Sequence, residues 1–235
     1  MKSKFITFVM GLLLAGSALA VDSGGNSVYI DQTNADNSTV SITQSGSGNM
    51  VGDPNNVSTP QFAIDGNNMA LTVTQDGVGN ALTGNFIGGD STASINQTGN
   101  FNTVNLNYGN MGSNGGTLNI GITGDTNAVG LNIGTTSDAS GYNYGLTING
   151  ANGGSGSNNA VTSTINSKNV TDTITISGNN NTLNTTQSGK SGHTITSSII
   201  GSNNTVGITQ DGATNPNTAT VNVTGNSAIV NITQH

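Results

Sequence analysis

The stretch that decides the fold is VTQDGVGN at residues 73–80, which recurs as INQTGNFN at residues 95–102. Each copy has a glutamine after alternating apolar positions, a glycine two residues later and an asparagine three residues after that. Equivalent residues in the two copies are 22 apart, and an earlier copy, ITQSGSGN, occupies residues 42–49. Self-similarity at a period of roughly 20–50 residues is typical of solenoids and other repeat proteins.

Later copies keep the glycine and the asparagine, whereas isoleucine or valine often replaces the glutamine of the first strand. A second series of glutamines, spaced by 23 and 24 residues, ends the second strand of the last copies. The amide side chains that we expect to stack are Gln44, Asn49, Gln75, Asn80, Gln97, Asn102, Asn127, Asn181, Gln187, Asn204, Gln210 and Gln234. The expected turn glycines are Gly46, Gly77, Gly99, Gly124, Gly178, Gly201 and Gly225.

Each copy alternates apolar and polar residues on both sides of the turn, which favours two short strands and not a helix. Glycine and asparagine tolerate the left-handed backbone of tight turns. Since one such unit cannot bury its apolar face alone, we predict that the units stack. The expected fold is an all-β solenoid of about eight strand-turn-strand coils between Asn26 and His235, with cross-β stacking of equivalent amides. The alternation is lost near residues 52–60, 134–144 and 150–158, where we expect inserted loops.

The N-terminus predicts export. Lys2 and Lys4 precede an apolar run at residues 5–15, and the small residues Ala18 and Ala20 suit a signal peptidase. We therefore interpret residues 1–20 as a signal peptide, with residues 21–235 as the secreted repeat domain. The apolar run is shorter than the roughly 20 residues that a membrane-spanning helix needs.

Composition excludes several classes of function. Beyond residue 20 the only basic residues are Lys168 and Lys190, so the chain cannot neutralise a phosphate backbone and no nucleic-acid partner is expected. Cysteine is absent, so disulfides do not contribute to stability. The only histidines, His193 and His235, are expected in a turn and at the chain end, and no carboxylate pair has the spacing of a general acid and base. We predict no enzyme, cofactor, metal site or small-molecule substrate.

The Gln-x-Gly-x-x-Asn pattern, repeated every 22–24 residues after alternating Ser, Val and Ile, resembles the curlin repeat of curli fimbria subunits. The resemblance covers most of residues 21–235 and is strongest at residues 38–49, 69–80, 91–106 and 173–210. It implies a secreted structural subunit of an amyloid fibre on a bacterial surface, with an adhesive or biofilm-matrix role. It also implies a nucleator subunit and an outer-membrane secretion pore as partners beside other copies of the chain.

Open strand edges give this resemblance a mechanism. The strand expected at residues 228–234 runs to the chain end without a cap, so we expect it to template residues 27–44 of the next copy. Two other functions remain open. The first is a monomeric surface-binding solenoid, such as an ice-binding protein or an adhesin, and it is suited by the Thr-x-Thr pattern at residues 72–74, 173–175, 194–196 and 218–220. The second is a β-helix protein that acts on polysaccharide. A disordered chain is the alternative to any fold.

Overall fold

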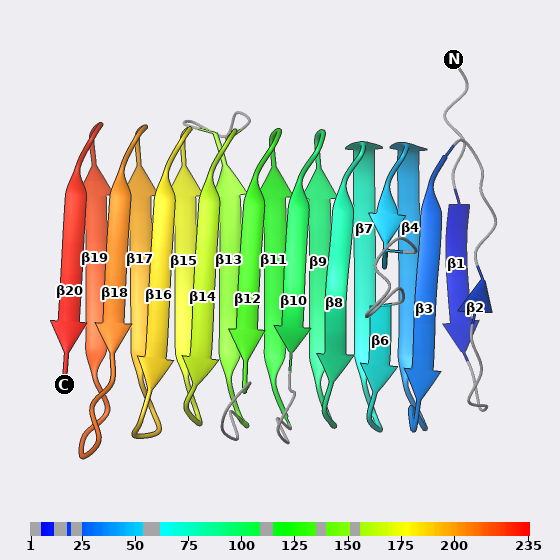
Figure 1. The fold of residues 1–235 in the computed structure, drawn as a ribbon, viewed down its shortest axis with the longest axis horizontal. Coiled ribbons are helices and arrows are strands. Elements are labelled where there is room, and N and C mark those ends of the chain that lie inside the picture. The colour runs from blue at the N-terminus through cyan, green and yellow to red at the C-terminus, as the bar shows by residue number, and fades with distance from the viewer. Residues whose placement is uncertain are drawn as a thin grey trace.

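The computed structural model describes residues 6–11, 18–19, 25–53, 62–108, 115–134, 140–150 and 156–235. Within these residues the chain forms strands and turns and no helix. The strands build two long sheets that face one another as a flattened rod, and the chain alternates between the sheets (Figure 1). The prediction of an all-β solenoid is confirmed. The described residues include no helix long and apolar enough to cross a membrane.

Sheet A contains nine strands, and all neighbours from β4 to β19 are parallel and in register. In spatial order they are β1 (Ile6–Gly11), β4 (Thr39–Ser47), β7 (Ala70–Val78), β9 (Thr92–Thr98), β11 (Thr117–Thr123), β13 (Asn143–Asn149), β15 (Thr171–Ser177), β17 (Thr194–Ile200) and β19 (Thr218–Thr224).

Sheet B contains eleven strands, of which two short ones, β5 and β6, share one layer between β3 and β8. The strands are β2 (Ala18–Leu19), β3 (Ser27–Thr33), β5 (Met50–Val51), β6 (Phe62–Asp65), β8 (Ala81–Ile87), β10 (Thr103–Tyr108), β12 (Ala128–Ile133), β14 (Ala160–Asn166), β16 (Thr182–Ser188), β18 (Thr205–Gln210) and β20 (Ile229–Gln234).

One sheet A strand and the sheet B strand that follows it make one coil, so β4 opens coil 1 and β19 with β20 forms coil 8. Strand β3 precedes coil 1 as a half-coil in sheet B. Two kinds of turn join the strands. The asparagine turns lead from sheet A to sheet B within a coil, and the return turns lead from sheet B to sheet A of the next coil.

The core lies between the sheets and consists of three inward positions per strand. In β9, for example, Ala93, Ile95 and Gln97 are buried, whereas the residues between them face solvent. Parallel in-register pairing places equivalent positions one above another, as in the column Ile95, Ile120. A very regular stack therefore buries a core that contains few aromatic side chains.

The predicted loops lie largely outside the described residues. Residues 54–60 of the first predicted loop, 135–139 of the second and 151–155 of the third lie outside the described residues. Strand β13 begins at Asn143, inside the loop expected at residues 134–144, and Tyr142 and Tyr144 are fully buried. The alternation of Tyr144, Leu146 and Ile148 explains this, because it places all three side chains in the core.

The segment interpreted as a signal peptide contributes β1 and β2. These two strands pair antiparallel with β4 and β3, whereas the pairings from β3 to β20 are parallel. If residues 1–20 are removed, the N-terminal edges of both sheets lose these neighbours.

Candidate functional site

The asparagine turns form a continuous hydrogen-bonded ladder. In coil 3, Asn102 Nδ2 donates to Asn80 Oδ1 at 3.0 Å and to the Gly124 carbonyl oxygen at 2.7 Å. Asn102 Oδ1 accepts from the backbone N–H and Nδ2 of Asn127, at 3.1 and 3.0 Å. Asn102 is fully buried, so these bonds form away from water. Each such asparagine links the coil before it to the coil after it.

Sequence reasoning missed two members of this ladder. Asn26 begins it on the half-coil, and Asn159 continues it in coil 5, after the insertion in that asparagine turn. Their positions, 23 residues before Asn49 and 22 before Asn181, were the signal. The complete ladder is Asn26, Asn49, Asn80, Asn102, Asn127, Asn159, Asn181 and Asn204.

The turn glycines stack on the same edge of the rod. Gly99 has φ +115°, and a Cβ added to it would lie 2.0 Å from the Gly124 carbonyl oxygen of the next coil. The equivalent Gly225 has φ +134° but no atom within 4 Å, because coil 8 is the last. Glycine is therefore required here both by backbone geometry and by the close approach of the next coil. The column is Gly46, Gly77, Gly99, Gly124, Gly156, Gly178, Gly201 and Gly225.

The first glutamine ladder lies in sheet A, beside the asparagine turns of coils 1–3. Gln44 Nε2 donates to Gln75 Oε1, and Gln75 Nε2 donates to Gln97 Oε1, both at 2.8 Å. Ile122 follows Gln97 in register, so Gln97 Nε2 bonds backbone carbonyls instead. From coil 4 to coil 8 the column is apolar: Ile122, Ile148, Ile176, Ile199 and Val223.

The second glutamine ladder lies in the opposite sheet, at the return-turn side of coils 6–8. Gln187 Nε2 donates to Gln210 Oε1 at 3.1 Å, and Gln210 Nε2 donates to Gln234 Oε1 at 2.9 Å. The donor always belongs to the earlier coil, so the ladder has a direction. The sequence assigned this series to the second strand of each copy, and the structure places that strand in the opposite sheet, with the glutamines on the other side of the core.

A buried carboxyl stands where the second ladder begins. Asp172 is 1% exposed, between Tyr144 and Ile195 in sheet A, and its Oδ1 accepts from Gln187 Nε2 at 2.8 Å. Asp172 Oδ2 and Gln187 Oε1 are buried without a partner among the described residues. Burial raises the pKa of Asp172 to about 7, although the Gln187 hydrogen bond acts in the opposite direction. Protonation of Asp172 removes the charge that burial penalises.

Sequence reasoning did not single out Asp172. The signal was present, because Asp172 stands two residues before Ile174 and four before Ile176, in the alternation that marks core positions. The same environment raises the pKa of Tyr144, through burial and then the nearby Asp172 carboxylate.

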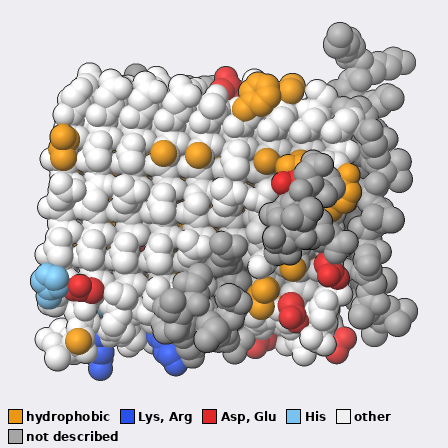
Figure 2. Space-filling model, viewed as in Figure 1, with side chains coloured by type: hydrophobic (Ala, Val, Ile, Leu, Met, Phe, Trp, Pro, Cys, Tyr) orange, Lys and Arg blue, Asp and Glu red, His pale blue; other side chains and the backbone are white. Residues whose placement is uncertain are grey.

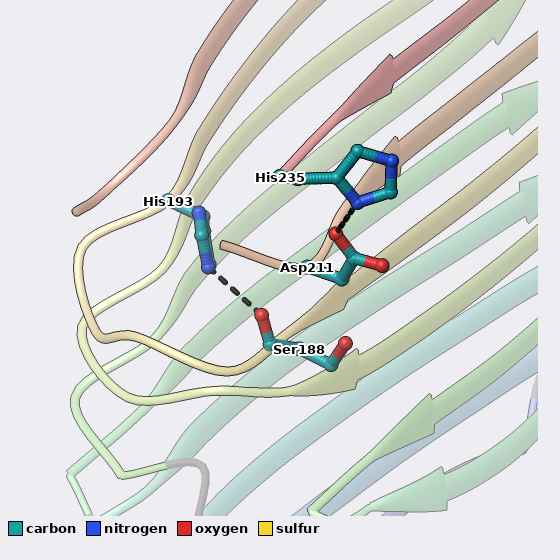
Figure 3. Close-up of polar contacts among 4 residues, drawn as sticks. All are labelled: Ser188, His193, Asp211 and His235. Carbon is teal, nitrogen blue, oxygen red and sulfur yellow. Dashed lines mark hydrogen bonds and ion pairs between the residues drawn. The ribbon is translucent and has the colours of Figure 1, made fainter. Parts of the chain in front are cut away.

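The two histidines occupy different surroundings on the return-turn side (Figure 3). His193 is fully buried, its Nδ1 accepts from the Asn217 backbone N–H at 3.0 Å, and its Nε2 lies 3.0 Å from the Ser188 carbonyl oxygen. This arrangement fits a neutral imidazole with its hydrogen on Nε2. His235 is exposed and lies 2.6 Å from the Asp211 carboxylate. Both contacts organise turns, and no cluster of three or more His, Cys, Asp or Glu side chains suited to a metal occurs among the described residues.

The C-terminal end of the rod is an open strand edge, whereas β1 and β2 cover part of the N-terminal end. The residues of β20 are half-buried or exposed, with Ile229 76% exposed. Ala228 takes the asparagine position of coil 8: its N–H donates to Asn204 Oδ1 at 2.9 Å, but it has no amide to continue the ladder. At the other end, β3 has only the short β2 on its outer edge. Gln32 Oε1 of β3 is buried and accepts no hydrogen bond from the described residues.

Comparison of the chain with protein-family models, with curated proteins and with solved structures finds no match. The ladders, the buried carboxyl and the open ends are therefore interpreted from their own geometry.

Proposed function

We propose that the protein is a structural subunit of a curli-like extracellular amyloid fibre that assembles by end-to-end stacking of strands. The observation that carries this proposal is the regular but unpaired strand β20: it has the same alternation and parallel register as interior strands, and no described residue pairs with its outer edge. Natural proteins usually cover or charge such edges to prevent association.

The ladders supply the physical basis for growth. An added coil gains backbone hydrogen bonds, apolar contacts and the directional amide bonds seen between interior coils. The same interactions that fold one chain would therefore join two chains. In this proposal the fibre is extracellular and serves adhesion or a biofilm matrix, with the nucleator subunit and secretion pore that the curlin resemblance implies.

Seeded growth tests the proposal. The exported, processed protein should convert into dye-binding fibres after a lag, and preformed fragments should remove the lag. Oriented fibres should give a meridional reflection near ~4.8 Å, the spacing between hydrogen-bonded strands. Protein that stays monomeric at high micromolar concentration, with or without seeds, would contradict the proposal.

One observation favours the alternative of a monomeric surface-binding solenoid. Threonines stack in columns on the outer face of sheet A, as at Thr171, Thr194 and Thr218. Hydroxyl arrays of this kind suit a flat ordered ligand such as ice. Thermal hysteresis from monomeric protein, without fibre growth, would favour this function over fibre formation.

A further inference from the structure

We infer that copies of the chain join through sheet B alone, with β20 of one copy parallel and in register with β3 of the next, and that this join is the weakest interface in the fibre. The inference rests on the proposed function, because it names the contact by which that fibre grows. It goes further in fixing the strands, the register and the defect at each boundary.

The inward residues of the two strands match. Strand β20 presents Val230, Ile232 and Gln234 at its inward positions, and β3 presents valine, isoleucine and glutamine at Val28, Ile30 and Gln32. Stacking β20 on β3 therefore places valine on valine, isoleucine on isoleucine and glutamine on glutamine. A shift of one residue would turn the apolar side chains to the solvent face, so this register is strongly preferred.

The amide groups at the two ends are complementary. In the interior, Gln210 Nε2 donates both to the Thr194 carbonyl oxygen and to Gln234 Oε1. Gln234 Nε2 makes the equivalent backbone bond, to the Thr218 carbonyl oxygen at 3.1 Å. Its second hydrogen has no acceptor among the described residues. In the next copy, Gln32 Oε1 is the buried acceptor without a donor. The join pairs these two groups in the same direction as the interior ladder.

The same register leaves a gap in the asparagine ladder. Ala228 comes to lie against Asn26 of the next copy, because Asn26 occupies the asparagine position of the half-coil. Each interior asparagine gives its backbone N–H and Nδ2 to the preceding Oδ1, as Asn102 does to Asn80. Ala228 has no such oxygen, so both hydrogen bonds are missing at every boundary.

Sheet A adds nothing at the join to compensate. Strand β3 fills one layer of sheet B, but the processed chain has no sheet A strand in that layer. The join therefore leaves one empty strand position in sheet A, between β19 of one copy and β4 of the next. In this structure β1 takes that position on β4, and it belongs to the segment expected to be removed on export. Processing therefore frees the edge of β3 from β2 at the same time.

Disulfide trapping tests the register. Outward-facing Thr233 is expected to lie over Asp31, so fibres grown from equal amounts of Asp31→Cys and Thr233→Cys protein should form covalent dimers on mild oxidation, with no competing cysteine in the chain. The matched control is Asp31→Cys with Asn231→Cys: the shift of two residues, roughly 6.8 Å along the strand, exceeds disulfide reach. Tyr29→Cys with Asn231→Cys should cross-link again.

Fibres that form normally but cross-link in neither in-register pair, or equally in the control, would overturn the join while leaving the fibre function standing. A chain that forms no fibres overturns both.

Filling the gap tests the defect. The variant Ala228→Asn restores two hydrogen bonds at each boundary and should slow monomer release from fibre ends by about tenfold. Ala213→Asn, an exposed return-turn position, is the control and should not change the release rate. Release from Ala228→Asn fibres at the wild-type rate, or faster, would overturn the claim of a weak join.

Discussion

The asparagine turns and the return turns solve the same task, reversing the chain between two sheets, in different ways. Every asparagine turn from the half-coil to coil 7 uses the same buried amide ladder, and a glycine backs it in each complete coil. The equivalent position in successive return turns holds Ser38, Met69, Ser91, Gly116, Tyr142, Val170, His193 and Asn217. One uniform edge is therefore enough to hold the coils in register.

The return turns hold residue types that the asparagine turns lack, namely lysine and histidine. Lys168, Lys190 and both histidines lie on the return-turn side. On the face of sheet B in Figure 2, most charged side chains lie along that edge, whereas the face itself is almost uncharged. The buried Asp172 also belongs to this side of the core, since it bonds Gln187 at the end of β16. The comparison teaches that stacking is enforced at one edge and that variation is tolerated at the other.

The largest effect is expected where the glycine column is broken. Gly99→Ala should destabilise the monomer by more than about 4 kcal/mol, because the added Cβ meets the Gly124 carbonyl oxygen at 2.0 Å. Gly225→Ala shares the positive φ but meets no atom, so it should cost only about 1 kcal/mol. Denaturant unfolding before polymerisation measures both, and similar losses would show that stacking does not require the glycine.

The asparagine ladder should show the next largest effect. Asn102→Ala removes the acceptor for two donors of Asn127 and the donor to Gly124, so it should cost about 3 kcal/mol or more. The return-turn counterpart is Ser91→Ala, which removes one local bond to the Gly89 carbonyl and should cost about 1 kcal/mol. Equal losses in the same unfolding assay would contradict the division of labour between the two edges.

Asp172 gives the return-turn side a pH dependence. Because its pKa is about 7 in the fold and 3.8 in the reference state, the folded chain favours the protonated carboxyl. Its contribution to stability is therefore complete below about pH 4 and is lost as pH rises towards 7, by about 2–4 kcal/mol. In the variant Asp172→Asn this site no longer titrates, so the pH dependence that it contributes to the free energy of unfolding should disappear. A wild-type chain no more stable at pH 5 than at pH 8, after comparison with the variant, would refute the assignment.

The smallest effect is expected at outward strand positions that touch neither turn. Gly121 lies in the middle of β11 and a Cβ there meets nothing within 4 Å, at a backbone angle that any residue can adopt. Gly121→Thr should raise stability by about 0.5–1 kcal/mol, through lower unfolded-state entropy and better strand propensity. A loss of stability would indicate that the outer face of sheet A is packed against something.

Much of this architecture was predictable because the chain repeats its physical constraints. The Gln-x-Gly-x-x-Asn spacing fixed the strands, the coil number and most of the asparagine ladder, since each copy needs the same left-handed turn. Asn26 and Asn159 were missed because the Gln-x-Gly part of the motif does not precede them, although their spacing to Asn49 and Asn181 follows the period.

What the pattern lacked was information on which sheet each residue faces. The sequence placed Gln97 in the first strand of its copy and Gln187 in the second, and the structure shows that these strands belong to opposite sheets. Asp172 belongs to no carboxylate pair with the spacing of a general acid and base, so no role was predicted for it, although its burial follows from the alternation around it. Tyr144 was assigned to a loop for a similar reason, because glycine and serine precede it.

The axial repeat of assembled fibres, measured by cryo-electron microscopy, tests the central claim most directly. Sheet B contributes nine layers from β3 to β20, with β5 and β6 in one layer, so each copy should advance the fibre by about 43 Å at ~4.8 Å per layer. Strands should run perpendicular to the fibre axis, with Gln234 of one copy beside Gln32 of the next. A repeat that lacks the β3 layer, strands parallel to the axis, or a chain that remains a soluble rod would contradict it.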